Sequence, residues 1–194
     1  MGLSHVVLTA VARDDLDDGG AIGFIDTVNA IKSCSSDITV ETLIPDFGGQ
    51  AEPLQALINE KPDVLNHNLE TVARLQRAVR PNAGYARSLT VLARAKALGS
   101  ITKSGLIVGL GETDDELTSA LADLASVGTD VVTIGQYLRP TSGHLPVHRW
   151  VEPTTFQMWA EKGHEMGIQH VEAGPLTRSS HKAAAAVRGL LPTP

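Results

Sequence analysis

Short apolar runs rich in β-branched residues alternate along the chain with amphipathic stretches. The runs predict six strands, at 5–10, 39–44, 64–66, 104–109, 131–136 and 168–172. Most of them are apolar nearly throughout, which is typical of strands that are covered on both faces in a parallel sheet.

The stretches between these runs have the apolar spacing of helices. Helices are predicted at 20–32, 53–59, 69–78, 88–98, 114–127 and 154–166. In the first of them, four apolar residues from Ile22 to Ile31 recur every three positions, and we expect them to share one buried face. Thr113 and Glu116 have the spacing of a capping box at the start of the fifth helix.

Strands that alternate with helices imply βαβ crossovers and therefore an α/β fold, either open or barrel-like. The chain has no internal repeat, linker or charge block, so we expect one domain over residues 1–182. Residues 183–194 are Ala-rich and then Pro-rich, which predicts a short helix followed by a loose C-terminal tail.

Composition places the chain among ordinary globular proteins. Its 194 residues are 42% hydrophobic and 20% charged, with a formal net charge of −6. Net acidity argues against a nucleic-acid partner, because binding to phosphates needs clustered Lys and Arg. The longest apolar stretches are too short to span a bilayer and no secretory signal is evident, so we expect a cytoplasmic protein without a membrane partner.

Cys34 is the single cysteine. One thiol excludes an internal disulfide and any Cys₃ or Cys₄ metal site contributed by this chain alone. The acidic segment RDDLDDGG at 13–20 is not an EF-hand loop, because a loop that starts at Asp14 would need an oxygen ligand where Leu16 stands. A solvated acidic turn before a helix and a hydroxyl-binding or ion-pairing role both fit this segment.

Polar residues follow the predicted strands directly, which is where α/β folds place their sites. Asn66, His67 and Asn68 come at the end of the third strand. Three such side chains cannot all be buried without hydrogen-bond partners, so we expect a ligand site at this strand end.

Three further segments have the same placement. Gly109, Gly111 and Glu112 form a turn between the fourth strand and a helix, where small residues let a ligand approach the backbone N–H groups. Such a turn also suits a phosphate or a purely structural role. Gln136 ends the fifth strand, and the segment RSS at 178–180 places two hydroxyls beside cations, which suits an anion, a metal centre or a plain surface turn.

Taken together, these segments resemble the lipoyl synthases, a family of radical S-adenosylmethionine (SAM) enzymes. The resemblance covers nearly the whole chain and rests on eight segments in order. They are TAVARDDLDDGG (9–20), ETLIPDF (41–47), PDVLNHNLETV (62–72), VRPNAGYARSL (79–89), TKSGLIVGLGET (102–113), TIGQYLRP (133–140), HLPVHRWVEPTTF (144–156) and GPLTRSS (174–180).

The resemblance implies a partial (β/α)₆ barrel with its site at the carboxyl ends of the strands. It implies two [4Fe–4S] clusters and SAM, of which one reduced cluster cleaves SAM to a 5′-deoxyadenosyl radical and the auxiliary cluster supplies two sulfur atoms. The implied substrate is an octanoyl chain on a lysine of a carrier protein, such as a lipoyl domain of a 2-oxoacid dehydrogenase or the glycine cleavage H protein. The implied electron donor is a ferredoxin or flavodoxin.

The resemblance also implies roles for individual residues. Ser180 would be an oxygen ligand of the auxiliary cluster, with Arg178 beside it. Six residues would help to hold SAM or the substrate, namely Asn66, Asn68, Gly109, Gly111, Glu112 and Gln136.

The chain departs from the family pattern in its cysteines. The family binds its clusters through CxxxCxxC and CxxxxCxxxxxC motifs that precede the region seen here, and this chain has neither. We therefore expect a barrel without its first strand, which retains no cluster and is inactive alone. The family also has tyrosine after the RSS segment, where this chain has His181.

Several alternatives remain for such a chain. Three of them keep the resemblance: a fragment of a lipoyl synthase, one half of a split enzyme, and a cluster-free pseudoenzyme that binds an octanoylated or lipoylated carrier domain. A different class is a metal-independent barrel aldolase or isomerase with a phosphate at 109–112. That class needs a lysine or carboxylate base at a strand end, and Lys103 precedes the predicted strand instead.

Overall fold

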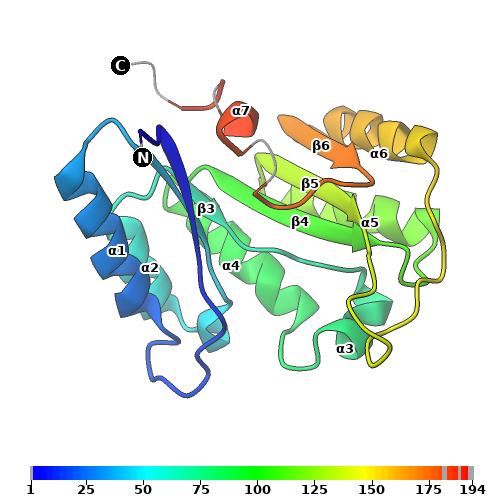
Figure 1. Ribbon diagram of the computed structural model, residues 1–194, viewed down its shortest axis with the longest axis horizontal. Helices are drawn as coiled ribbons and strands as arrows, with labels where there is room; N and C mark the ends of the chain where they lie inside the picture. The colour runs from blue at the N-terminus through cyan, green and yellow to red at the C-terminus, as the bar shows by residue number, and fades with distance from the viewer. Residues whose placement is uncertain (1, 181–182, 188, 192–194) are drawn as a thin grey trace.

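Six parallel strands form one curved sheet in the order in which they occur along the chain. The computed structural model describes residues 2–180, 183–187 and 189–191. The strands are β1 (His5–Thr9), β2 (Thr39–Leu43), β3 (Val64–Asn66), β4 (Thr102–Val108), β5 (Val131–Gln136) and β6 (His170–Gly174). Every neighbouring pair is parallel, and β1 and β6 are the two edges of an open sheet (Figure 1). The predicted α/β fold with a partial barrel is confirmed.

Helices cover the outer face of this sheet (Figure 1). The longer ones are α1 (Ala21–Cys34), α2 (Ala51–Asn59), α4 (Tyr85–Ala97), α5 (Asp114–Ser126) and α6 (Pro153–Glu165). One core lies between β4, β5 and helices α5 and α6, and a second lies between β2, β3 and helices α1, α2 and α4. None of the described helices is long and apolar enough to cross a membrane.

Helix α5 begins at the predicted capping box. The Thr113 hydroxyl accepts a hydrogen bond from the Glu116 backbone N–H, and the Glu116 carboxylate accepts one from the Thr113 N–H. Two backbone donors that the helix itself cannot satisfy are thereby paired.

Two sequence predictions about helices are wrong. The predicted helix at 69–78 is instead a loop followed by a short 3₁₀ helix (Ala73–Leu75) and the single turn α3 (Gln76–Val79), because Glu70 has a φ of 67° and bridges to β4. In α1, Phe24 and Val28 are buried while Ile22 is 62% exposed. Residues spaced by three drift around a helix by about 60° per step, so the four apolar positions do not share one face.

The inner face of the sheet carries a buried ion pair. Lys103 lies on β4 rather than before it, and its Nζ atom is 2.9 and 3.0 Å from the two carboxylate oxygens of Glu41 on β2. Asn66, on the strand between them, donates to the same carboxylate at 2.8 Å. None of the three residues is exposed. The pair therefore ties three strands together inside the barrel.

Helix α7 (Ala183–Val187) closes the end of the barrel at which the strands begin (Figure 1). Ala186 and Val187 are buried against Val64 and Val131, the first residues of β3 and β5. The short helix predicted for this Ala-rich segment is present. His181 lies outside the described residues, and the division between a domain and a tail stays a prediction.

Candidate functional site

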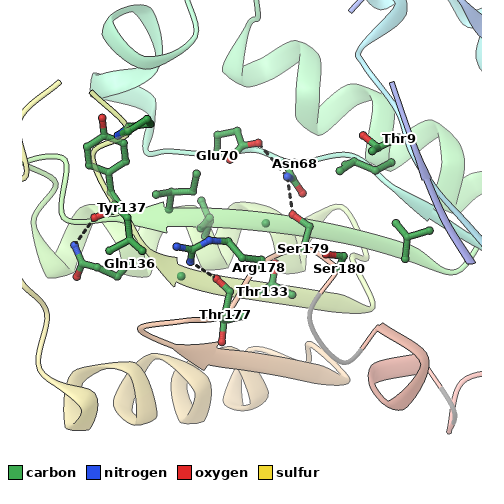
Figure 2. A pocket seen from close by; sticks show the side chains of 18 residues that line it. Thr9, Asn68, Glu70, Thr133, Gln136, Tyr137, Thr177, Arg178, Ser179 and Ser180 are labelled. Carbon is green, nitrogen blue, oxygen red and sulfur yellow. Dashed lines mark hydrogen bonds between the residues drawn. The ribbon is translucent and has the colours of Figure 1, made fainter. Parts of the chain in front are cut away.

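A cavity of about 590 Å³ opens at the carboxyl ends of the strands. Its volume lies in the range of sites that enclose a small molecule. Leu43, Leu106 and Ile107 supply apolar surface. The polar lining comes from strand ends and from one C-terminal segment (Figure 2), and consists of Thr9, Asn68, Glu70, Thr133, Gln136, Tyr137, Thr177, Arg178, Ser179 and Ser180.

Asn68 connects two sides of this cavity. Its Nδ2 atom donates to Glu70 Oε1 at 3.0 Å and to Ser179 Oγ at 2.8 Å, as Figure 2 shows. Its Oδ1 atom is buried and has no hydrogen-bond partner. An unpaired buried acceptor is costly unless a donor reaches it, so this oxygen marks a place where a ligand hydroxyl or N–H group would be stabilised.

Glu70 is the acidic group of the cavity. Burial raises the pKa of its carboxyl group, and the hydrogen bond from Asn68 and the charge of Arg80 partly oppose that shift. A carboxylate whose pKa is raised in a cleft is a frequent property of ligand and catalytic sites. Glu70 was not among the predicted site residues, although it stands two positions after Asn68 in the same strand-end segment.

The segment 177–180 forms one wall of the cavity. Gly135 of β5 lets this segment approach closely, because a Cβ atom on Gly135 would lie 2.1 Å from the Thr177 carbonyl oxygen. The same carbonyl accepts a hydrogen bond from Arg178 Nη1 at 2.6 Å. Ser180 is exposed at the cavity wall. The fold thus brings the RSS segment opposite Asn68, as Figure 2 shows.

The Gly109–Glu112 turn lies beside this cavity and does not line it. The Glu112 carboxylate accepts the backbone N–H groups of Gly109 and Leu110 at 2.6 and 2.9 Å, so those donors are already used. Gln136 joins the turn to the cavity lining. Its side-chain Nε2 group donates to the carbonyls of Val108, Tyr137 and Arg149, while its Oε1 atom accepts from the Val151 N–H.

His67 is buried between neighbouring elements and does not reach the cavity. Its Nδ1 atom is 2.9 Å from the Ile44 carbonyl oxygen, and its Nε2 atom is 2.9 Å from Ser88 Oγ. A carbonyl oxygen only accepts, so Nδ1 carries the proton and Nε2 accepts from the serine hydroxyl. Burial lowers the pKa of His67 to about 4, which keeps the ring neutral at physiological pH.

The acidic segment 13–20 folds as a turn with local partners. Arg13 forms a bidentate ion pair with Asp15, at 2.8 and 2.7 Å. Asp18 accepts the backbone N–H groups of Gly20 and Ile22 at the start of α1. These contacts match the expected acidic turn that leads into a helix.

The described residues do not form a cluster-binding site. Cys34 is exposed at the last position of α1, and no group of three or more His, Cys, Asp or Glu side chains gathers to hold a metal ion in the part of the chain that the structure describes. A [4Fe–4S] cluster is held by four thiolates, so the donor set present here does not fit one.

The fold and the site define a class. A family model of the Radical SAM superfamily matches residues 1–124. A parallel sheet of this kind also occurs in methylornithine synthase, with a TM-score of 0.65 at 14% identity over 97% of this chain and 67% of that one. A domain of a pyruvate-formate lyase-activating enzyme from Bacteroides vulgatus gives a TM-score of 0.59 at 11% identity, over 86% of this chain and 98% of that domain. The chain belongs to the Radical SAM superfamily.

Within that superfamily, the chain is similar to lipoyl synthases. It is 50% identical to the lipoyl synthase of Chlorobaculum parvum over 95% of this chain and 64% of that protein. It is 51% identical to the lipoyl synthase of Mycobacterium avium over 94% of this chain and 60% of that protein. The chain therefore spans less than two thirds of the length of these relatives.

The structure separates the eight predicted site residues into two groups. Asn68, Gln136, Arg178 and Ser180 line one cavity. The other four do not line it, and are Asn66, Gly109, Gly111 and Glu112. Asn66 binds the buried ion pair, and the remaining three shape the turn after β4.

Proposed function

We propose that this chain forms the ligand-binding part of a lipoyl synthase, which inserts two sulfur atoms into an octanoyl chain on a lysine of a carrier protein. The observation that carries the proposal is the cavity at the strand ends, where the RSS segment faces Asn68 and Glu70 in a chain half identical to lipoyl synthases. The other superfamily neighbours share the fold at 14% identity or less, and so support the architecture alone.

Asn68 and Glu70 are the groups best suited to hold SAM. The free Oδ1 atom of Asn68 accepts a donor, and Glu70 offers carboxylate oxygens to a pair of hydroxyls. Both lie in the segment that follows β3, and the backbone of Glu70 is bridged to Leu106 of β4, which holds this segment against the sheet. The apolar surface of Leu43 and Ile107 suits the acyl chain.

The remaining predicted residues act through the shape of the site. Gly109, Gly111 and Glu112 hold the chain as it leaves β4, and Gln136 fixes that turn to the loop at 149–151. Asn66 supports the strand ends through the buried pair of Glu41 and Lys103. Ser180 is exposed on the cavity wall, and this position supports a role as an oxygen ligand of the auxiliary cluster.

The clusters supply the radical and the sulfur in this family, and their thiolates would come from sequence other than these 194 residues. The partners of the complete system are an octanoylated lipoyl domain of a 2-oxoacid dehydrogenase or the glycine cleavage H protein, with a ferredoxin or flavodoxin as electron donor. In this proposal the described residues bind SAM, orient it and enclose the acyl chain.

Complementation tests this function. The chain replaces the matching region of the Mycobacterium avium relative, and the chimera is expressed in a bacterium that lacks its own lipoyl synthase. We expect growth without added lipoate, and lipoylated carrier domains by mass spectrometry. Ser180→Ala in the same chimera should abolish lipoylation, whereas Ser142→Ala in an exposed loop should not.

Two results would contradict the proposal. The proposed enzymatic function would be contradicted by a chimera that shows iron–sulfur absorbance but leaves the carrier proteins octanoylated. Tight binding of an octanoylated carrier by that inactive chimera would favour the carrier-binding pseudoenzyme instead.

A further inference from the structure

Ser179 is assigned no contact with a ligand in the function proposed above, although it stands between two cavity residues. It is half-buried, and its Oγ atom accepts a hydrogen bond of 2.8 Å from Asn68 Nδ2. The two residues are 111 positions apart in the sequence. This contact joins the C-terminal segment to the segment that follows β3, as the dashed line between Asn68 and Ser179 in Figure 2 shows.

Asn68 is a rigid anchor for that contact. Its second amide hydrogen is held by Glu70 Oε1 at 3.0 Å, and its backbone carbonyl accepts from Arg80 Nη1 at 2.7 Å. The side chain also lies against β4, where a Cβ atom on Gly105 would be 2.8 Å from Asn68 Oδ1. A side chain fixed from three directions can hold a partner in place at little further entropy cost.

The C-terminal segment is less firmly held beyond Thr177. Up to that residue it is fixed by hydrogen bonds of Gln136 N–H to Pro175 O and of Thr177 N–H to Gly174 O, at 3.4 and 3.1 Å. Beyond Thr177, the described residues 178–180 have two hydrogen bonds to other parts of the chain, namely that between Ser179 and Asn68 and that from the Ala183 N–H to the Ser180 carbonyl at 3.4 Å. Ser180 itself is exposed.

We propose that Ser179 is a positioning residue, whose hydrogen bond to Asn68 fixes where the Ser180 hydroxyl lies on the cavity wall. The role of Ser180 rests on the proposed function, whereas the position of its segment does not. Because Asn68 also offers its free Oδ1 to a ligand, the same side chain links the occupied cavity to the segment that carries Ser180.

Hydrogen exchange of the 194-residue chain, measured without ligand, tests this position. The readout is the exchange of the backbone amides at 176–180, normalised to helix α5 so that a change in global stability cancels. Ser179→Ala and Asn68→Ala should each speed exchange about fivefold, the value of one hydrogen bond. The double variant should be no faster than either single variant, because the two side chains share one contact.

Two variants serve as controls. Ser179→Thr keeps a hydroxyl at this position and should restore slow exchange, which a change in packing alone would not do. Ser142→Ala removes a hydroxyl from an exposed loop and should leave residues 176–180 unchanged.

The proposal is overturned if Ser179→Ala leaves the exchange rates at 176–180 unchanged. It is also overturned if the effects of Ser179→Ala and Asn68→Ala on these rates add up in the double variant. A parallel measurement with SAM separates this inference from the function. Failure of SAM to protect any segment of the chimera contradicts the proposed function, whereas the ligand-free measurements on the 194-residue chain still decide the role of Ser179.

Discussion

Acid should destabilise this protein through His67, and the size of the effect follows from its surroundings. The ring is fully buried, donates through Nδ1 to the Ile44 carbonyl and accepts through Nε2 from Ser88. Burial is the main cause that lowers its pKa to about 4, from 6.5 for an unperturbed histidine. The unfolded chain therefore takes up the proton more readily than the folded chain.

The sign and magnitude follow from this difference. Above pH 6.5 the ring is neutral in both states, so it imposes no penalty on folding. As the pH falls below 6.5, His67 binds a proton in the unfolded state but stays neutral in the folded state until the pH approaches 4. The free energy of unfolding then decreases by about 2 kcal/mol at pH 5 and by about 3 kcal/mol at pH 4, relative to neutral pH.

Urea denaturation between pH 4 and 8 measures this loss. His67→Gln removes the titrating ring, so the difference in stability between wild type and variant should shrink by the same 2 to 3 kcal/mol as the pH is lowered. Other ionisable groups cancel in that difference. Ser142→Ala, in an exposed loop, removes no ionisable group and should give a difference that stays constant with pH. Parallel stability curves for wild type and His67→Gln would refute the assignment of the acid loss to this ring.

Three further substitutions test the scaffold of the site, each by chemical denaturation. Lys103→Met should lower the free energy of unfolding by about 3 to 5 kcal/mol because it leaves the Glu41 carboxylate buried without its cation. Glu41→Leu combined with Lys103→Met should recover most of that loss. An equal loss in the single and the double variant would contradict the pairing. Thr113→Ala should cost about 1 kcal/mol by removing the cap of α5, and no change would show that the cap contributes nothing. Gly109→Ala should cost at least about 1 kcal/mol, because φ is 96° and the new Cβ atom would lie 2.2 Å from Gln136 Nε2; a stable variant would mean that the turn can shift.

The local sequence determined most of the fold. Short runs with β-branched residues located all six strands, and most of these runs are apolar nearly throughout because a strand covered on both faces is apolar along its length. The capping box at Thr113 and the helix at 183–187 also follow from neighbouring residues alone. The wrong helix prediction at 69–78 has a cause that is not local. Glu70 adopts a positive φ because it bridges to β4, and that contact cannot be read from the residues around it.

The motif resemblance determined the candidate site only as a set of segments. It grouped Asn66 with Asn68 and the turn at 109–112 with both. The curved sheet then separated them, because the positions of neighbouring strands decide which side chains meet a cavity and which meet each other. Asn66 points to the ion pair between strands, and Asn68, two residues on, reaches the cavity.

Only the tertiary structure paired Lys103 with Glu41 and Asn68 with Ser179. Each pair joins residues more than 60 positions apart, as the separations of 62 and 111 show. Apolar periodicity is a property of adjacent residues, so the sequence by itself determines the elements. Long-range polar contacts depend on strand order, register and sheet curvature, and those appear only when the whole chain is folded.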